Sequence, residues 1–247
     1  MPVRNVLLGL SAALAACASA NDAPQPIPGT DARVDGPLGV DDAPGPDAPS
    51  GIDAPPADAA IPMFKLSQTL TNTSLPNGSV ACRNGDNTTA DNSWYRVFRL
   101  ADEGITGGAR ITAVSFGVQQ ATGFPTVQIK IGTYSGSVQP PPATLDAALI
   151  TPLAETSYVV PTVTTSATQY VTVPITANAP ALSQVIIEIA APDMLGTSKV
   201  FRLGANTDGE DAPAYLKSVT CGNLVPETAA SLGFPGRHFV ITATGTN

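Results

Sequence analysis

The residues best suited to metal chemistry fall in two short polar stretches, each typical of a turn. The first holds four oxygen-bearing side chains: Asn206, Asp208, Glu210 and Asp211. The second has the same character, with Asp86, Asn87, Asp91 and Asn92. Calcium takes about six to eight oxygen ligands, which side chains at alternate positions of a turn can supply. The first stretch is therefore a candidate structural calcium site. The competing interpretation is that both are ordinary turns, since Asp and Asn side chains mimic backbone turns.

Enzyme chemistry finds little support in the sequence. The chain has one histidine, His238, so a serine triad could use no other and a His-Glu-x-x-His zinc site cannot form. The nucleophile elbow Gly-x-Ser-x-Gly is absent. A carboxylate-based glycoside hydrolase would need two acids about 5 to 10 Å apart across a cleft, and the sequence singles out no such pair. We therefore predict no catalytic residues and read His238 as a half-buried strand residue.

Two cysteines, Cys82 and Cys221, lie far apart in the part of the chain that reads as folded. Each is flanked by turn-forming residues, which does not favour a catalytic thiol. Two thiols in one exported domain admit a single intramolecular pairing, so we predict a disulfide between them. The alternative is two unpaired, buried cysteines.

The third cysteine, Cys17, follows a segment typical of a secretory signal. Arg4 is the only charge before an apolar run over 6–14, which is too short to span a bilayer as a helix. The sequence Leu14-Ala15-Ala16-Cys17 resembles the lipobox of bacterial lipoproteins. That resemblance implies that residues 1–16 are a cleaved signal peptide and that Cys17 carries the acyl chains, palmitate among them, that anchor the protein in a lipid membrane. Ala18, which is not aspartate, is compatible with sorting to the outer membrane of the cell envelope.

Residues 17–62 have the composition of a tether. The segment repeats Asp-Ala-Pro, and its eight acidic side chains face one base, Arg33, so most of the net charge of −8 lies here. It has too few large apolar residues to offset the entropy of ordering, and we predict a disordered linker. The repeats resemble the tethers of predicted lipoproteins from Gram-negative soil bacteria. An acidic motif that binds calcium or a partner is the less favoured alternative.

Residues 63–247 change to short runs of β-forming residues separated by Gly, Pro and Asn. The clearest run is 125–134, where Val127, Ile129 and Ile131 alternate with polar residues. Nine strands are expected, over 64–70, 94–100, 111–118, 125–134, 170–175, 185–189, 200–203, 215–219 and 239–243. With no long helix to connect parallel strands, we predict an all-β fold, an antiparallel, jelly-roll-like β-sandwich. One short helix is expected over 226–232 and a proline-rich loop over 136–142.

The aromatic residues of this domain divide by type. We expect Trp94, Phe98, Phe116, Phe201 and Phe239 to be core. The tyrosines are candidates for a surface that stacks on sugar rings: Tyr95, Tyr134, Tyr158, Tyr170 and Tyr215. The alternative is that they lie at the edge of the core.

A second resemblance rests on runs over 92–98 and 111–118, on Cys221-Gly222 and on Gly233-Phe234-Pro235. Together they look like an unnamed β-sandwich module of secreted bacterial proteins, which implies a binding or accessory role. The slightly acidic domain has no basic run, so nucleic acid is excluded as a partner. We expect an envelope lipoprotein that presents a non-catalytic binding module for a carbohydrate, a protein or another surface molecule. A glycoside hydrolase and a structural cell-envelope component remain the alternatives.

Overall fold

The alternating run predicted from the sequence forms strand β4 (Thr126–Tyr134) in the computed structural model, which describes residues 63–76, 78–166 and 169–247. Along β4, Val127, Ile129 and Ile131 are buried while the residues between them face outward or are only partly covered. The signal peptide, Cys17 and the tether lie outside the described residues. Within the described part, no helix is long and apolar enough to cross a membrane.

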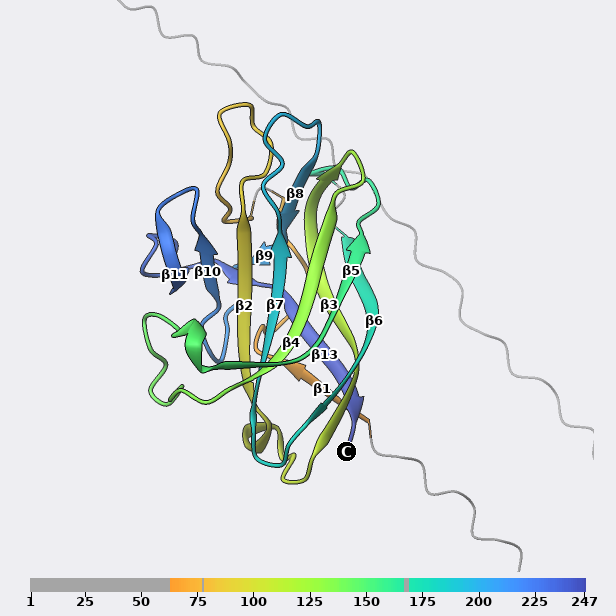
Figure 1. Cartoon of the computed structure of the whole chain (residues 1–247), viewed down its shortest axis with the longest axis vertical. Coiled ribbons are helices and arrows are strands. Elements are labelled where there is room, and N and C mark those ends of the chain that lie inside the picture. Colours follow the sequence, from red (N-terminus) through yellow and green to blue (C-terminus); the bar gives the residue numbers. More distant parts are fainter. Residues whose placement is uncertain (1–62, 77, 167–168) are drawn as a thin grey trace, which may run out of the picture. The chain divides into compact units, whose positions relative to one another are not determined.

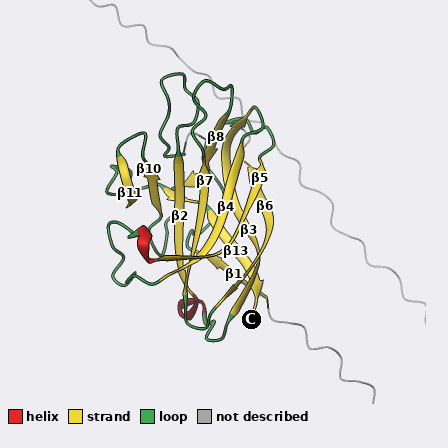
Figure 2. Cartoon of the chain, viewed as in Figure 1, coloured by secondary structure: helices red, strands yellow, loops and turns green. Residues whose placement is uncertain are grey.

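The strands form two antiparallel sheets that pack face to face (Figure 1 and Figure 2). The five-stranded sheet has the order β1-β13-β3-β6, and β8 pairs with the far end of β3. Its strands are β1 (Met63–Ser67), β3 (Ala109–Thr122), β6 (Gln169–Ala179), β8 (Val200–Leu203) and β13 (Ile241–Thr246). The six-stranded sheet has the order β11-β10-β2-β7-β4-β5. Besides β4 it contains β2 (Asn92–Arg99), β5 (Ile150–Val159), β7 (Gln184–Ala191), β10 (Tyr215–Ser218) and β11 (Asn223–Thr228).

Three kinds of smaller element complete the described chain. The short strands β9 (Ala205–Asn206) and β12 (His238–Phe239) pair with each other. Two single-turn 3-10 helices, η1 (Leu100–Glu103) and η2 (Ala147–Leu149), lie in connections. The proline-rich stretch 136–142 contains no helix or strand, which confirms the predicted loop.

The strand pairing is nested like a long hairpin that has been rolled up. At its tip β4 pairs with β5, then β3 with β6, β2 with β7, and β1 with β13. Successive nested pairs alternate between the two sheets. This is the connectivity of a jelly roll, so the predicted all-β antiparallel sandwich is confirmed.

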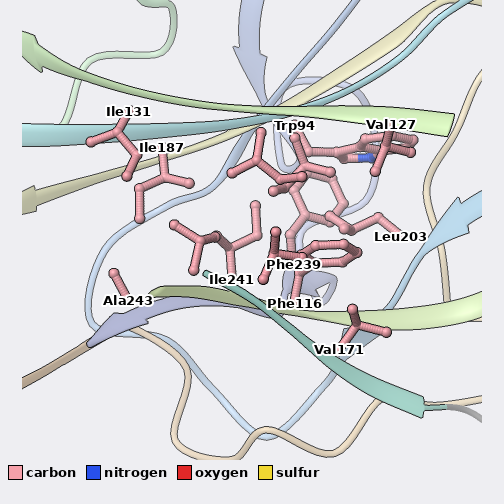
Figure 3. Packing of buried hydrophobic residues seen from close by; sticks show 14 of the residues in the cluster. Trp94, Phe116, Val127, Ile131, Val171, Ile187, Leu203, Phe239, Ile241 and Ala243 are labelled. Atoms are coloured by element: carbon pink, nitrogen blue, oxygen red, sulfur yellow. The ribbon is translucent and has the colours of Figure 1, made fainter. Parts of the chain in front are cut away.

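The core lies between the sheets and contains five aromatic side chains, three of which are labelled in Figure 3. Trp94 of β2 and Phe116 of β3 come from opposite sheets, and Phe201 contacts both in edge-to-face geometry, with ring centroids 5.7 and 6.2 Å away. Phe98 and Phe239 are also buried. All five aromatic residues expected in the core are therefore there. Edge-to-face pairs add about 0.5 to 1.5 kcal/mol each to the stabilisation from burial.

Two expectations about secondary structure fail in the same half of the chain. The predicted helix over 226–232 is wrong, because Glu227 and Thr228 continue β11 and pair with Leu216 and Tyr215 of β10. Pro226 fits that strand since β11 is the edge of its sheet, where a missing N–H costs least. Strand β5 was not expected; Pro152 and a bulge in its pairing with β4 interrupt its alternation.

Residues 192–240 form an insertion between the last two strands of the rolled hairpin. It contributes β8 to one sheet, β10 and β11 to the other, and the pair β9 and β12. Cys221, Glu210 and His238 all belong to it, and so does the whole first polar stretch.

Candidate functional site

The four residues of the first polar stretch are not gathered into a calcium site. Glu210 Oε2 lies 2.8 Å from Arg96 Nη1, and Glu210 Oε1 lies 3.1 Å from His238 Nδ1. Asp208 accepts a hydrogen bond from the Thr71 hydroxyl. The described residues include no cluster of three or more His, Cys, Asp or Glu side chains that could hold a metal ion. The side chains of Asn206, Asp208 and Glu210 are directed at partners within the protein, an arrangement that does not support the calcium site predicted for these three residues and Asp211.

Arg96 is the centre of this interior network. The side chain is fully buried and points between the sheets, where Nε and Nη2 donate to the Phe239 carbonyl at 3.0 and 2.8 Å. Nη1 also donates to the Ala212 carbonyl at 2.6 Å. Burial lowers the pKa of the guanidinium, and the Glu210 carboxylate opposes that effect. Because Arg96 joins β2 to two parts of the insertion, the network is structural, and His238 belongs to it through Glu210.

The second polar stretch secures the disulfide. Cys82 and Cys221 are bonded, with Cα atoms 6.0 Å apart, so the predicted pairing is confirmed. The Asn92 side chain accepts from Cys82 N at 2.7 Å and donates to the Cys82 carbonyl at 3.0 Å. Asp91 accepts from the backbone N–H groups of Val219 and Thr220, both at 2.9 Å. These carboxylate and amide groups position the two cysteines rather than a cation.

A cavity of about 340 Å³ opens on the face of the six-stranded sheet that points away from the core. Outward-facing residues of four neighbouring strands line it: Tyr95 on β2, Glu188 on β7, Lys130 on β4 and Lys217 on β10. Its rim is formed by Ala147 of η2 and by Ile150 and Pro152 of β5. Pockets of this volume, with an apolar floor and a few convergent polar groups, are the usual form of a small-ligand site.

Gly132 makes room for this cavity. It lies on the outward face at the bulge between β4 and β5, beside Ile186. A Cβ at this position would lie 2.7 Å from the Thr151 carbonyl oxygen and 3.3 Å from the Ile186 side chain. Any larger residue would therefore displace the floor.

Three polar groups inside the cavity are connected. The Tyr95 hydroxyl donates to Glu188 Oε1 at 3.2 Å, and Lys130 Nζ lies 3.4 Å from Glu188 Oε2. Burial, reinforced by the Glu188 charge, raises the pKa of Tyr95, so its phenol stays neutral and able to donate. Lys217 differs, because its side chain makes no hydrogen bond or ion pair with any described residue.

Two further hollows lie on the same face. One of about 190 Å³ is lined by Gln128, Glu155 and Ser157, and one of about 210 Å³ by Gln128, Ser157 and Ala190, so the two share residues. Glu155 is the cross-strand neighbour of Lys130, which lines the first cavity. We call the three hollows together the sheet groove. Its succession of polar recesses suits an extended ligand better than a compact one.

A cavity of about 390 Å³ also lies beside the disulfide, away from the sheet groove. Leu216, Leu232 and the half-exposed Phe234 make it largely apolar on one side. Its polar lining comes from Ser79, Arg83 and Asn223. The sheet groove has the larger set of convergent charged and hydroxyl groups and is the stronger candidate.

The tyrosines predicted for a sugar surface separate between the two sheets. Tyr95, Tyr134 and Tyr215 pack together on the outward face of the six-stranded sheet, where they are almost fully buried. Tyr158 packs against the edge of the main core, and Tyr170 is 40 % exposed on β6. The sequence reasoning named Tyr95 but missed Glu188 and Lys217. Lys130 could be assigned to the outward face from the alternation in β4.

Comparisons with known proteins give only distant similarities. No protein-family model matches the sequence, and no curated protein matches it. The chain is similar to the cysteine protease and lectin-like domains of Cwp84, a surface layer associated protein of Clostridium difficile, with 15% identity and a TM-score of 0.44. That match covers 64% of this chain and 33% of the other. A second structure, the clostridial cysteine protease Cwp84 after propeptide cleavage, matches at 12% identity and a TM-score of 0.48, over 75% of this chain and 40% of the other. This chain thus spans well under half the length of either protein, and neither likeness extends to function.

Proposed function

We propose that this protein is a non-catalytic binding module that holds a polysaccharide in the sheet groove. The observation that carries the proposal is the run of hollows along the outward face of one sheet, open to solvent and lined by hydroxyl, amide and charged groups over an apolar floor. Saccharides present hydroxyl groups on all sides of an extended chain, so a site needs both donors and acceptors along its length. Tyr95, Gln128, Glu188 and Ser157 supply them.

We propose further that this module is held at a membrane surface. In the proposal, residues 1–16 are removed, Cys17 is acylated, and 17–62 hold the domain away from the lipid headgroups. Several buried acyl chains, at about 0.8 kcal/mol per CH₂, would make attachment nearly permanent. The same argument assigns the protein to the bacterial cell envelope, and the residue after Cys17 is compatible with the outer membrane.

The first test is affinity electrophoresis and calorimetry of the full-length protein in detergent against a panel of plant and bacterial polysaccharides. The matched variants are Q128A, in the groove, and T176A, an exposed residue on β6 of the other sheet. We expect retardation by at least one polysaccharide and a loss of about fivefold or more in affinity for Q128A alone. Absence of binding at millimolar concentration across the panel, or equal losses in both variants, would refute the proposal.

A glycoside hydrolase is favoured by one observation. Glu155 and Glu188 both lie opposite Lys130, on the strands that flank β4. Two strand spacings put their backbones about 9 to 10 Å apart, near the separation of about 6.5 to 9.5 Å that inverting enzymes use for their carboxyl groups. Lys130, however, occupies the strand between them and contacts Glu188. Release of reducing ends that disappears in both E155Q and E188Q would establish the enzyme and replace the binding proposal.

A further inference from the structure

The sheet groove contains one lysine side chain, that of Lys217, that has no hydrogen-bond or ion-pair partner among the described residues. Lys130 is engaged with Glu188, whereas Lys217 lines the same cavity without a hydrogen bond or ion pair. Asp91, an acid whose partners follow β10 in sequence, accepts from the backbone of Val219 and Thr220. Lys217 is partly buried as a residue, in the middle of β10.

The remaining groups of the cavity do not neutralise Lys217. Glu188 is directed at Lys130 and at the Tyr95 hydroxyl. Ser93, the cross-strand neighbour of Lys217 on β2, is neutral. The cavity therefore presents a local positive charge within a protein whose formal net charge is −8. Most of that negative charge lies in residues 17–62, so the pocket is a local positive site on a domain that is itself only slightly acidic, and it would attract an anionic group.

We propose that the sheet groove takes a saccharide that bears a carboxylate, such as a uronate, with the carboxylate bound by Lys217 and the sugar hydroxyls by Tyr95, Lys130 and Glu188. This inference rests on the proposed function and names its ligand class. A carboxylate matches a lysine ammonium as one charge-assisted hydrogen bond. No arginine is among the described residues that line this cavity, so the anionic group would be held by a single ammonium and not by a guanidinium fork.

The test compares ligands that differ only in charge. Oligogalacturonate and oligomannuronate of four residues are titrated into the full-length protein in detergent, each beside its methyl ester, which keeps the shape and removes the charge. A charge-assisted hydrogen bond corresponds to about tenfold or more in affinity, so at least one acid is expected to bind that much more tightly than its ester.

Three variants assign this preference to Lys217. K217M is expected to reduce the acid-to-ester ratio to about one, and K217R to retain most of it. K65M makes the same charge change at an exposed position on β1 of the opposite sheet and is expected to leave the ratio unchanged. Circular dichroism and the melting temperature confirm that each variant is folded.

The outcomes separate this inference from the proposed function. If an ester binds as tightly as its acid, or if K217M keeps the preference, the carboxylate proposal is overturned while saccharide binding stands. If neutral polysaccharides bind and neither uronate does, the same conclusion follows. If no saccharide of either kind binds, both proposals fail.

Discussion

Asp91 and Asn92 are neighbours in the sequence, and each holds one end of the same disulfide. Asn92 is buried and bonds both backbone groups of Cys82, while Asp91 reaches the turn 218–220 that precedes Cys221. The side chains point in opposite directions because consecutive residues at a strand start alternate between faces. One dipeptide therefore sets the approach of two cysteines that are 139 residues apart.

Removing the disulfide is expected to destabilise the domain strongly. The bond closes a loop with a sequence separation of 139, and the C82A/C221A pair should lower the free energy of unfolding by about 3 to 5 kcal/mol. Urea denaturation followed by tryptophan fluorescence measures this, with the reduced wild-type protein as the comparison. A loss below about 1 kcal/mol would show that the insertion is held by its strand pairing alone.

Replacing Arg96 should be among the most damaging substitutions. R96M leaves the Glu210 carboxylate without its closest cation, and the Phe239 and Ala212 carbonyls without their donor, and is expected to cost about 3 to 5 kcal/mol. The matched control is R99M on the same strand, whose exposed pair with Asp102 contributes at most about 1 kcal/mol. Guanidinium denaturation compares them.

A double variant separates the buried charge from lost packing. R96M leaves the Glu210 carboxylate without its cation, and R96M/E210Q removes that charge. The double variant should therefore regain part of the stability that R96M loses. Equal stability of the single and double variants would place the whole effect of Arg96 in its carbonyl contacts.

Asp91 is expected to make the free energy of unfolding fall at acid pH. Partial burial alone would raise its pKa, but hydrogen bonds from Thr220, Val219 and Ser218 outweigh that effect and lower the pKa below its ordinary value. The stabilisation is therefore present above about pH 4, where an unfolded aspartate is ionised, and is lost as the pH falls through the lower folded pKa.

Urea unfolding between about pH 2 and 5 tests this pH dependence. The wild-type protein should lose stability toward acid more steeply than D91N, which keeps an acceptor but has no charge. Parallel curves for the two proteins would assign the acid dependence to other carboxylates, such as Asp86.

Tyr215 is expected to make the free energy of unfolding fall at alkaline pH, whereas Asp91 acts at acid pH. Burial, chiefly, raises the pKa of its phenol to about 12, and the hydroxyl donates to the Pro142 carbonyl at 3.1 Å. The folded state favours the neutral phenol, so this stabilisation is complete below about pH 10 and declines as the pH rises through about 12. The unfolding free energy of Y215F should fall less steeply over that range. An absorbance titration in which all tyrosines ionise together near pH 10 would contradict the assignment.

Most of the fold could be predicted from the sequence because one face of each central strand is buried. The alternation in 125–134 and the aromatic residues of β2 and β3 record that burial directly. β5 and β11 lie at the edges of the six-stranded sheet, where one side of the backbone is unpaired and proline is tolerated. Pro152 and Pro226 weakened the strand signal there, and Pro226 followed by Glu227 imitated the start of a helix.

The candidate site was harder to predict because it depends on register between strands. Tyr95, Lys130 and Glu188 come from β2, β4 and β7, and only the pairing of Glu188 with both neighbours brings them together. Lys217 needs the insertion to place β10 beside β2. The acidic stretches misled for a related reason: their spacing is suitable for calcium, but partners distant in sequence, such as Arg96 and Thr220, engage their oxygens. The cellular location, by contrast, could be inferred from the lipobox resemblance of Leu14 to Cys17, and it stays a prediction.

The pairing of β1 with β13 has a consequence for the order of events when the protein is made. Met63 lies opposite Thr246, so the five-stranded sheet cannot be completed until β13 has left the ribosome. Nested pairing of this kind is also dominated by contacts between distant residues, which slows folding. For an exported chain, as proposed above, both effects delay folding: the sandwich closes only when β13 reaches β1.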